Sequence, residues 1–265
     1  MTISQPPTPG TALWVYAHPR RDSLGERIFR EGTHALAESH TVLTSDLYVQ
    51  NFDPVLRESD LGQLAGTEGN FAELLGDAYA ARQLPEDVRA EQQKVAEAEL
   101  LIFQFPLWWY GMPAMLKGWF DRVLTAGFAH GDLDEQTGLP LRYGDGGLSG
   151  RKALIVVTAG DDERTLGPRG ISGDLDALLF PLTHGVLWYT GVPTLPLHAV
   201  FDADDMSGAA VERELARLRE RLSLIRGERP QLYRRLQDNE YRGTRALHAD
   251  LAPGRTDLGI HLASS

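Results

Sequence analysis

The chain has 265 residues and carries 26 Lys and Arg against 37 Asp and Glu, for a formal net charge of −11. Nucleic-acid binding and docking on anionic lipid need clustered cations, so this balance argues against both kinds of partner. The absence of cysteine excludes disulfides, thiolate nucleophiles and Cys-ligated metals. No basic and apolar leader is visible at the start, and the most apolar stretch is too short to span a bilayer, so we expect a cytoplasmic protein.

The length suggests one principal core with an extension, because domains usually run about 100–200 residues. We expect a loose N-terminal tail at residues 1–10, which are rich in Pro, Ser and Thr, and one domain over residues 11–226. Residues 227–265 are polar and rich in Arg, with few large apolar side chains. Such a segment is too thin to fold alone, so we expect it to pack on the core or on a partner subunit.

Five apolar runs alternate with segments of helical periodicity. The predicted strands cover residues 11–17, 41–48, 99–105, 151–160 and 191–200, and the predicted helices cover 24–39, 86–98, 113–125, 174–189 and 207–226. Residues 51–86 are polar, and we expect a long excursion there with little regular structure. The alternation predicts an α/β fold of the flavodoxin-like, doubly wound type: a five-stranded parallel sheet with helices on both faces. Such sheets bind ligands beyond the carboxyl ends of their strands, which directs attention to three loops.

The loop after the first strand has the composition of an anion site. It lacks the G-x-G-x-x-G fingerprint, but His18, Arg20, Arg21 and Ser23 stand just before a helix start. Ser23 is a predicted N-cap, with Glu26 three residues on in a capping-box pattern. Free N–H groups and the helix dipole favour a phosphate there. A solvated loop with an ordinary cap explains the same spacing equally well.

The loops after the third and fourth strands suit a flat ring. Pro106, Leu107, Trp108, Trp109 and Tyr110 put three aromatics at the ligand-binding edge, with Gly111 permitting close approach of the backbone. Core packing is the alternative explanation for such a cluster. The small residues of the fourth-strand loop can close over the other edge of the ring, where main-chain amides would stabilise negative charge; these are Thr158, Ala159, Gly160 and Asp161.

These loops lie in longer segments that resemble the NAD(P)H:quinone oxidoreductase (DT-diaphorase) family. The resemblance covers residues 12–225, with an echo in TDLGIHL near the end. Its most specific part is FQFPLWWYGMPAMLKGWFDRV at 103–123. Further matches are AHPRRDS at 17–23, SDLY at 45–48, NFDP at 51–54, AEQ at 90–92 and GISGDLDALLFPLTHGVLWYTG at 170–191.

The resemblance implies a flavodoxin-like flavoenzyme that forms a homodimer with the active site at the subunit interface. It implies FAD as cofactor at this length, with FMN in shorter relatives, and NAD(P)H as the hydride donor. His18, Ser23, Leu24 and Gly25 match the adenine-side and phosphate contacts. The residues from Pro106 to Tyr110 match those lining the isoalloxazine ring, and Thr158 to Asp161 match its pyrimidine edge. Asp121 matches an acidic residue that reaches the neighbouring subunit's flavin.

The predicted acceptor pocket departs from the family pattern. It comprises Trp109, Tyr110, His130, Asp132 and Ser172. Leu166 and Ser172 stand where the family has a charge-balancing Tyr and His, His130 and Asp132 replace a pair of tyrosines, and Ala72 replaces a glutamine. His130 is therefore a candidate proton donor, with an exposed loop residue as the alternative. The carboxylate of Asp132 would disfavour an anionic acceptor.

The resemblance therefore implies two-electron, ping-pong hydride transfer from NAD(P)H to a small quinone-like acceptor. An azo, nitro or biosynthetic tailoring reductase on the same fold is one alternative, and a flavin-bearing regulatory subunit is another. Hydrolase chemistry is disfavoured because Ser172 lacks a G-x-S-x-G elbow. No metal site is expected, since the eight histidines lack ligand spacing; His184, His198, His248 and His261 are predicted to be packing or surface residues.

Overall fold

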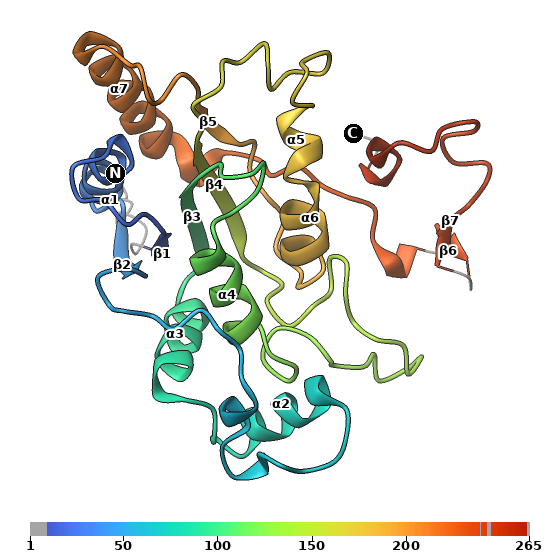
Figure 1. Cartoon of the computed structure of the whole chain (residues 1–265). Helices are drawn as coiled ribbons and strands as arrows, with labels where there is room; N and C mark the ends of the chain where they lie inside the picture. The colour runs from blue at the N-terminus through green and yellow to red at the C-terminus, as the bar shows by residue number, and fades with distance from the viewer. Residues whose placement is uncertain (1–9, 239, 243–244, 264–265) are drawn as a thin grey trace, which may run out of the picture.

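The computed structural model describes residues 10–238, 240–242 and 245–263. Its centre is a parallel five-stranded sheet with strand order β2-β1-β3-β4-β5 (Figure 1). The strands are β1 Gly10–Tyr16, β2 His40–Asp46, β3 Leu100–Pro106, β4 Lys152–Thr158 and β5 His198–Val200. The predicted flavodoxin-like fold is confirmed. The expected tail at 1–10 lies outside the described residues except for Gly10, which begins β1.

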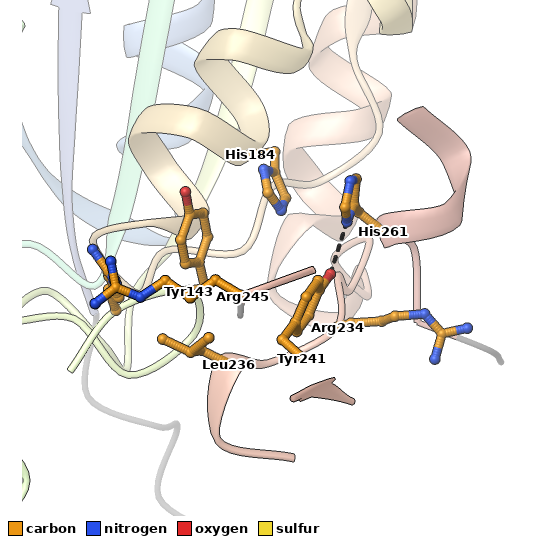
Figure 2. A pocket seen from close by; sticks show the side chains of 8 residues that line it. Tyr143, His184, Arg234, Leu236, Tyr241, Arg245 and His261 are labelled. Atoms are coloured by element: carbon orange, nitrogen blue, oxygen red, sulfur yellow. Dashed lines mark hydrogen bonds between the residues drawn. The ribbon is translucent and has the colours of Figure 1, made fainter. Parts of the chain in front are cut away.

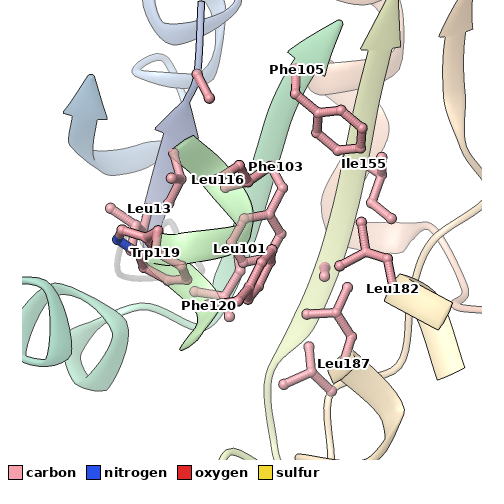
Figure 3. Packing of buried hydrophobic residues seen from close by; sticks show 14 of the residues in the cluster. Leu13, Leu101, Phe103, Phe105, Leu116, Trp119, Phe120, Ile155, Leu182 and Leu187 are labelled. Atoms are coloured by element: carbon pink, nitrogen blue, oxygen red, sulfur yellow. The ribbon is translucent and has the colours of Figure 1, made fainter. Parts of the chain in front are cut away.

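The three central strands, β1, β3 and β4, are predominantly apolar because both of their faces are buried. Alternate residues of each strand point to opposite faces. In β1, Leu13 and Val15 join one hydrophobic cluster, whereas Ala12, Trp14 and Tyr16 join the other. The first cluster is filled by the helices α3 Glu86–Glu97 and α4 Ala114–Val123 (Figure 3). The second is covered by α1 Leu24–Leu36 and α7 Gly208–Leu224, which continues into η3 Ile225–Gly227.

The excursion after β2 has more structure than the sequence predicts. It forms η1 Glu58–Leu64 and α2 Phe71–Ala80, so the expectation of little regular structure over 51–86 is wrong. Asn70 caps α2 by accepting hydrogen bonds from two first-turn N–H groups. Leu61, Leu75 and Leu84 belong to a small separate core that holds the excursion together. Tertiary packing here outweighs the polar composition.

The excursion is fastened to α4 by a buried ion-pair cluster. The Arg122 guanidinium donates to Asp60, to Asp87 and to the carbonyl of Asp53 at distances of 2.5–3.4 Å. Gly118, one turn earlier, permits this approach, since a Cβ there would lie 1.9 Å from the carbonyl oxygen of Pro54. Gly118 and Arg122 of the GWFDRV motif therefore have a structural role.

The helix predicted over 174–189 is not continuous. It divides into α5 Leu175–Leu178, α6 Phe180–Leu182 and a π-helical turn, η2 Thr183–Trp188. Pro181 supplies no N–H for the helical ladder, which explains the break near Leu179.

The C-terminal extension lies beside this broken helix. The Tyr233 hydroxyl donates to Thr183 Oγ1 at 2.9 Å, and the Trp188 indole donates to the carbonyl of Arg234 at 3.1 Å. Its elements are short: η4 Leu236–Asp238, β6 Tyr241–Arg242, β7 Ala246–Leu247 and η5 Leu258–His261. Among the described residues, no helix combines the length and the apolar character needed to cross a bilayer.

Candidate active site

The three loops singled out in the sequence converge on one cavity of about 490 Å³, called here the three-loop cavity. They meet because the carboxyl ends of parallel strands lie at the same edge of a sheet. The Leu107 N–H donates to the Thr158 carbonyl at 2.7 Å and links the loops after β3 and β4, and the Ala159 N–H donates to the Val200 carbonyl of β5 at 2.8 Å. The lining residues are His18, Arg20, Asp22, Ser23, Leu24, Gly25, Pro106, Leu107, Trp108, Thr158, Ala159, Gly160, Ala203 and Asp204.

The first wall of the cavity is the N-terminus of α1. Ser23 is the N-cap, as predicted, and its hydroxyl accepts the Glu26 N–H at 3.1 Å. The N–H groups of Leu24 and Gly25 lie in the first turn, where a helix provides no acceptor. Gln104 fixes this end of the helix to β3: its buried amide donates to the Gly25 carbonyl at 2.6 Å. The result is a set of donors held at a positive helix end.

The two arginines of the first loop have different surroundings. Arg20 lines the cavity and forms an exposed bidentate pair with Asp22. Arg21, which we expected to add donors to the anion site, is instead paired with Glu26 and Asp46 and does not line the cavity. In a capping box the Glu26 carboxylate would accept a hydrogen bond from the N–H of the N-cap residue. Here that carboxylate pairs with Arg21 instead.

The aromatic loop is a strained tight turn. Trp108 and Gly111 exchange main-chain hydrogen bonds of 3.1 Å in both directions. The central residues, Trp109 and Tyr110, have φ values of 51° and 58°, in a region that L side chains adopt at a cost of about 1–2 kcal/mol each. Trp109 is 97% exposed and Trp108 43%, so this is not core packing. Strain that holds aromatic rings outward at a sheet edge is characteristic of functional sites.

Three polar side chains that do not line the three-loop cavity form a hydrogen-bonded chain. Ser172 Oγ lies 3.2 Å from the Tyr110 hydroxyl and 3.3 Å from an Asp161 carboxylate oxygen. A serine hydroxyl has one proton, so donation to Asp161 leaves its oxygen free to accept from Tyr110. The sequence identified all three residues but not their connection. Leu166, the other position where the charge-balancing residues are missing, is buried in the hydrophobic core.

The remaining predicted acceptor residues lie away from the three-loop cavity of this chain. His130 is half-buried, with its ring centroid 5.9 Å from that of Tyr189, and burial lowers the pKa of its imidazole. Asp132 is exposed on the following loop. Asp121 is partly exposed on α4 and pairs with Lys117 at 2.5 Å. Ala72 is exposed in the first turn of α2.

Sequence reasoning missed several cavity residues. Ala203 and Asp204 follow β5, a fourth strand end at the same sheet edge, and Asp22 belongs to the first loop. The predicted parallel sheet could have identified Ala203 and Asp204, because it brings the carboxyl end of every strand, β5 included, to one edge. Gln104 belongs to the FQF motif, but its role could not be predicted because it depends on the pairing of β1 with β3. Its side chain also accepts a hydrogen bond from the indole N–H of Trp14, on β1, at 2.9 Å.

The lining suits a flavin nucleotide. A phosphate chain needs N–H and cationic donors, which Leu24, Gly25 and Arg20 provide at the end of α1. The Ser23 hydroxyl donates to the Arg20 carbonyl at 3.0 Å and would have to leave that acceptor to bind a phosphate. A flat ring needs an aromatic face and a close main-chain edge, which Trp108 and Gly160 provide. Among the described residues, no group of His, Asp and Glu has the arrangement of a metal site.

Comparison with known proteins agrees with this geometry. A family model described as "Flavodoxin-like fold" matches residues 11–222. A ribosyldihydronicotinamide dehydrogenase-like protein, traD of Penicillium crustosum, is 37% identical over 259 residues, covering 94% of each chain. NAD(P)H dehydrogenase [quinone] 1 of Rattus norvegicus is 33% identical over 222 residues, covering 83% of this chain and 78% of its own. The crystal structure of a proposed quinone reductase from Klebsiella pneumoniae superimposes with a TM-score of 0.89 at 36% identity, covering 96% of this chain and all of that one.

The fold and the cavity at the carboxyl edge of the sheet define a flavodoxin-like protein. Within that class, the chain belongs to the NAD(P)H:quinone oxidoreductase family, and it is an oxidoreductase.

Proposed function

We propose that this protein is a flavin-dependent NAD(P)H:quinone oxidoreductase that delivers two electrons together to a small quinone-like acceptor in a ping-pong cycle. The supporting observation is the convergence of a phosphate-type helix terminus and an aromatic turn on a single cavity. The quinone dehydrogenase names of the relatives support the same acceptor class. A flavin, when bound, supplies the hydride chemistry, and the protein supplies orientation and electrostatics.

FAD is the proposed cofactor, because the α1 end of the cavity offers Ser23, His18 and Arg20 as donors for a diphosphate. In this proposal Leu24 and Gly25 approach the phosphates with their main chain. The ring lies against Pro106, Leu107 and Trp108, with Thr158, Ala159 and Gly160 at its edge. Purification tests this directly: we expect a yellow protein that releases FAD on heating, identified by chromatography. A colourless protein that takes up neither FAD nor FMN would refute the proposal.

Tyr110, Ser172 and Asp161 are proposed to carry the proton that accompanies hydride transfer. Their chain of contacts at 3.2 and 3.3 Å supports this role, and it would replace the family's Tyr and His. Tyr110→Phe and Ser172→Ala should each lower kcat for acceptor reduction about 10–100-fold, within the usual contribution of acid–base groups, without displacing the flavin. Unchanged kcat in both variants would exclude the relay.

The active unit is proposed to be a homodimer in which the second subunit completes the acceptor pocket. Trp109, which follows the lining residue Trp108, and Ile171, which precedes Ser172, are 97% and 99% exposed, which supports an interface over these loops. In a dimer, His130 and Asp132 of one chain would serve the cavity of the other. Light scattering should give twice the monomer mass, and His130→Ala should slow acceptor reduction. A monomer with full activity would contradict both points.

Turnover measurements separate the alternatives. We expect NADPH or NADH to reduce menadione through this protein faster than a soluble azo dye. A reversed preference would favour an azo or nitro reductase. A flavin-bearing regulatory subunit would show little turnover with free NAD(P)H and excess menadione. A cytoplasmic location is proposed as well, since the cysteine-free sequence needs no oxidising compartment; fractionation of cells expressing the full chain would test it.

A further inference from the structure

A second cavity, of about 340 Å³, lies where the C-terminal extension meets the rest of the chain. We call it the extension cavity. Its lining comes from the loop before β4, from η2 and from the extension, and comprises Arg142, Tyr143, His184, Arg234, Leu236, Tyr241, Arg245 and His261. None of these residues lines the three-loop cavity. Figure 2 shows Tyr143 and Tyr241 on opposite sides of the hollow, with His184 and His261 toward one end.

The walls of the extension cavity are mainly flat rings. The ring centroids of Tyr143 and His184 are 5.0 Å apart, and those of His184 and His261 are 5.4 Å apart. The Tyr241 hydroxyl and His261 Nδ1, 2.8 Å apart, hydrogen-bond to each other across the extension (Figure 2). Burial lowers the pKa of His184 to about 4, so its ring is uncharged at neutral pH. These two histidines, predicted as packing or surface residues, pack against neighbouring rings and also line the cavity, whose walls suit an aromatic ligand.

The charge in the extension cavity is positive and incompletely neutralised. Three arginines line it, and no Asp or Glu does. Arg234 is paired with Glu240. Within the part of the chain that the structure describes, Arg142 and Arg245 form no ion pair, and the buried Nε of Arg142 has no hydrogen-bond acceptor. The Arg142 guanidinium lies 5.9 Å from the ring centroid of Tyr189, within the range of a cation–π contact.

We infer that the extension cavity binds a small aromatic carboxylate. Its ring would lie between the side chains of Tyr143 and Tyr241, and its carboxylate would accept hydrogen bonds from Arg142 and Arg245. Arginine binds planar carboxylates through two parallel N–H donors, which provides both affinity and orientation. The volume is near the lower end of the roughly 300–1,000 Å³ range of ligand sites, so a ligand of one or two rings fits better than a nucleotide.

This site goes beyond the proposed reductase function, and its lining residues are separate from those of the three-loop cavity. It lies near the proposed acceptor residue His130, because the Tyr189 ring contacts both His130 and Tyr143. Because its walls come from both the core and the extension, a bound ligand would hold the extension in place. The experiment therefore measures binding rather than turnover, so its failure would leave the reductase proposal unaffected.

Isothermal titration of the purified holoprotein with 2-naphthoate tests the inference. We expect saturable binding with a dissociation constant below about 1 mM. The neutral isostere 2-naphthamide should bind at least about tenfold more weakly, because it offers no charge to the arginines. No saturable heat with 2-naphthoate, or equal affinity for the two probes, would overturn the inference.

Variants locate the binding. Arg142→Gln and Arg245→Gln should each weaken 2-naphthoate binding about tenfold, corresponding to the loss of one charge-assisted hydrogen bond. Leu236→Trp should block binding by filling the hollow while keeping both charges. Arg213→Gln, an exposed arginine on α7, is the matched control and should bind as the wild type does. Wild-type affinity in all three cavity variants would refute the assignment, and far-UV spectra would show whether each variant is folded.

Discussion

Two arginine–aspartate clusters in this protein have the same chemistry and opposite surroundings. Arg122 is 4% exposed and is saturated by Asp60, Asp87 and a carbonyl oxygen. Arg20 is 72% exposed at the mouth of the three-loop cavity, where Asp22 is its only ion-pair partner among the described residues. Removing one member of a buried pair leaves an uncompensated charge, whereas an exposed pair is screened by water. Solvent access therefore separates an architectural arginine from one that is free to meet a ligand.

The largest effect is expected at the buried cluster. Arg122→Ala leaves Asp60 buried without its cation and should lower the free energy of unfolding by about 3–5 kcal/mol. Urea denaturation followed by circular dichroism measures this change. Lys117→Ala, which breaks an exposed pair on the same helix, is the control and should cost less than about 1 kcal/mol. Equal losses in the two variants would show that burial does not decide the difference.

His184 is half-buried, between the buried Arg122 and the exposed Arg20, and its contribution to stability is tested by changing the pH. The folded protein resists protonating this ring until the pH approaches about 4, whereas the unfolded chain takes up the proton near the ordinary value of about 6.5. The free energy of unfolding should therefore fall as the pH drops through this window. His184→Gln should remove on the order of 1 kcal/mol of that fall between about pH 7 and pH 5, after allowance for the partly exposed ring. Parallel urea curves at the two pH values measure it, and identical pH dependence in both proteins would contradict it.

In the aromatic turn, by contrast with the two preceding cases, a substitution is expected to raise the free energy of unfolding. Trp109→Asn removes a side chain that packs against almost nothing and suits the left-handed backbone. For the dissociated chain we expect the free energy of unfolding to rise by up to about 1 kcal/mol. The dimer, in which Trp109 is proposed to lie at the interface, should not show this gain, and acceptor reduction should slow. Thermal unfolding and menadione turnover on the same preparation test both parts. A less stable variant would mean that Trp109 makes contacts in the functional assembly.

The smallest stability effect is expected at the open cluster. Arg20→Ala should change the free energy of unfolding by less than about 0.5 kcal/mol, because both partners are exposed. It should nevertheless weaken flavin retention, measured by equilibrium dialysis, through loss of a phosphate donor. Normal retention would remove Arg20 from the proposed cofactor site. Arg30→Ala, on the exposed surface of α1, is the matched control.

The local sequence pattern predicted the structure correctly where the tertiary contacts favour the same conformation. The runs around Leu13, Phe103 and Ile155 are predominantly apolar, and each became a central strand with both faces buried. Ser23 became an N-cap because its hydroxyl satisfies a first-turn N–H whatever the rest of the chain does. Where long-range contacts decide, local patterns were insufficient: Leu61 and Leu75 stabilise an excursion that reads as polar, and Pro181 breaks a helix that reads as continuous.

By itself, the sequence determined the first four strands, the first helix cap, the aromatic loop and the family, because each depends on neighbouring residues or on a specific stretch of them. The fifth strand, predicted over 191–200, is limited to His198–Val200. Only the tertiary structure decided that Arg21 would be taken by Asp46, that Ser172 would meet Tyr110, and that segments as distant as Tyr143 and His261 would enclose a second cavity. Such encounters depend on how helices and loops pack across the sheet. No local periodicity encodes them, because contacts between distant segments form only when the whole chain is folded.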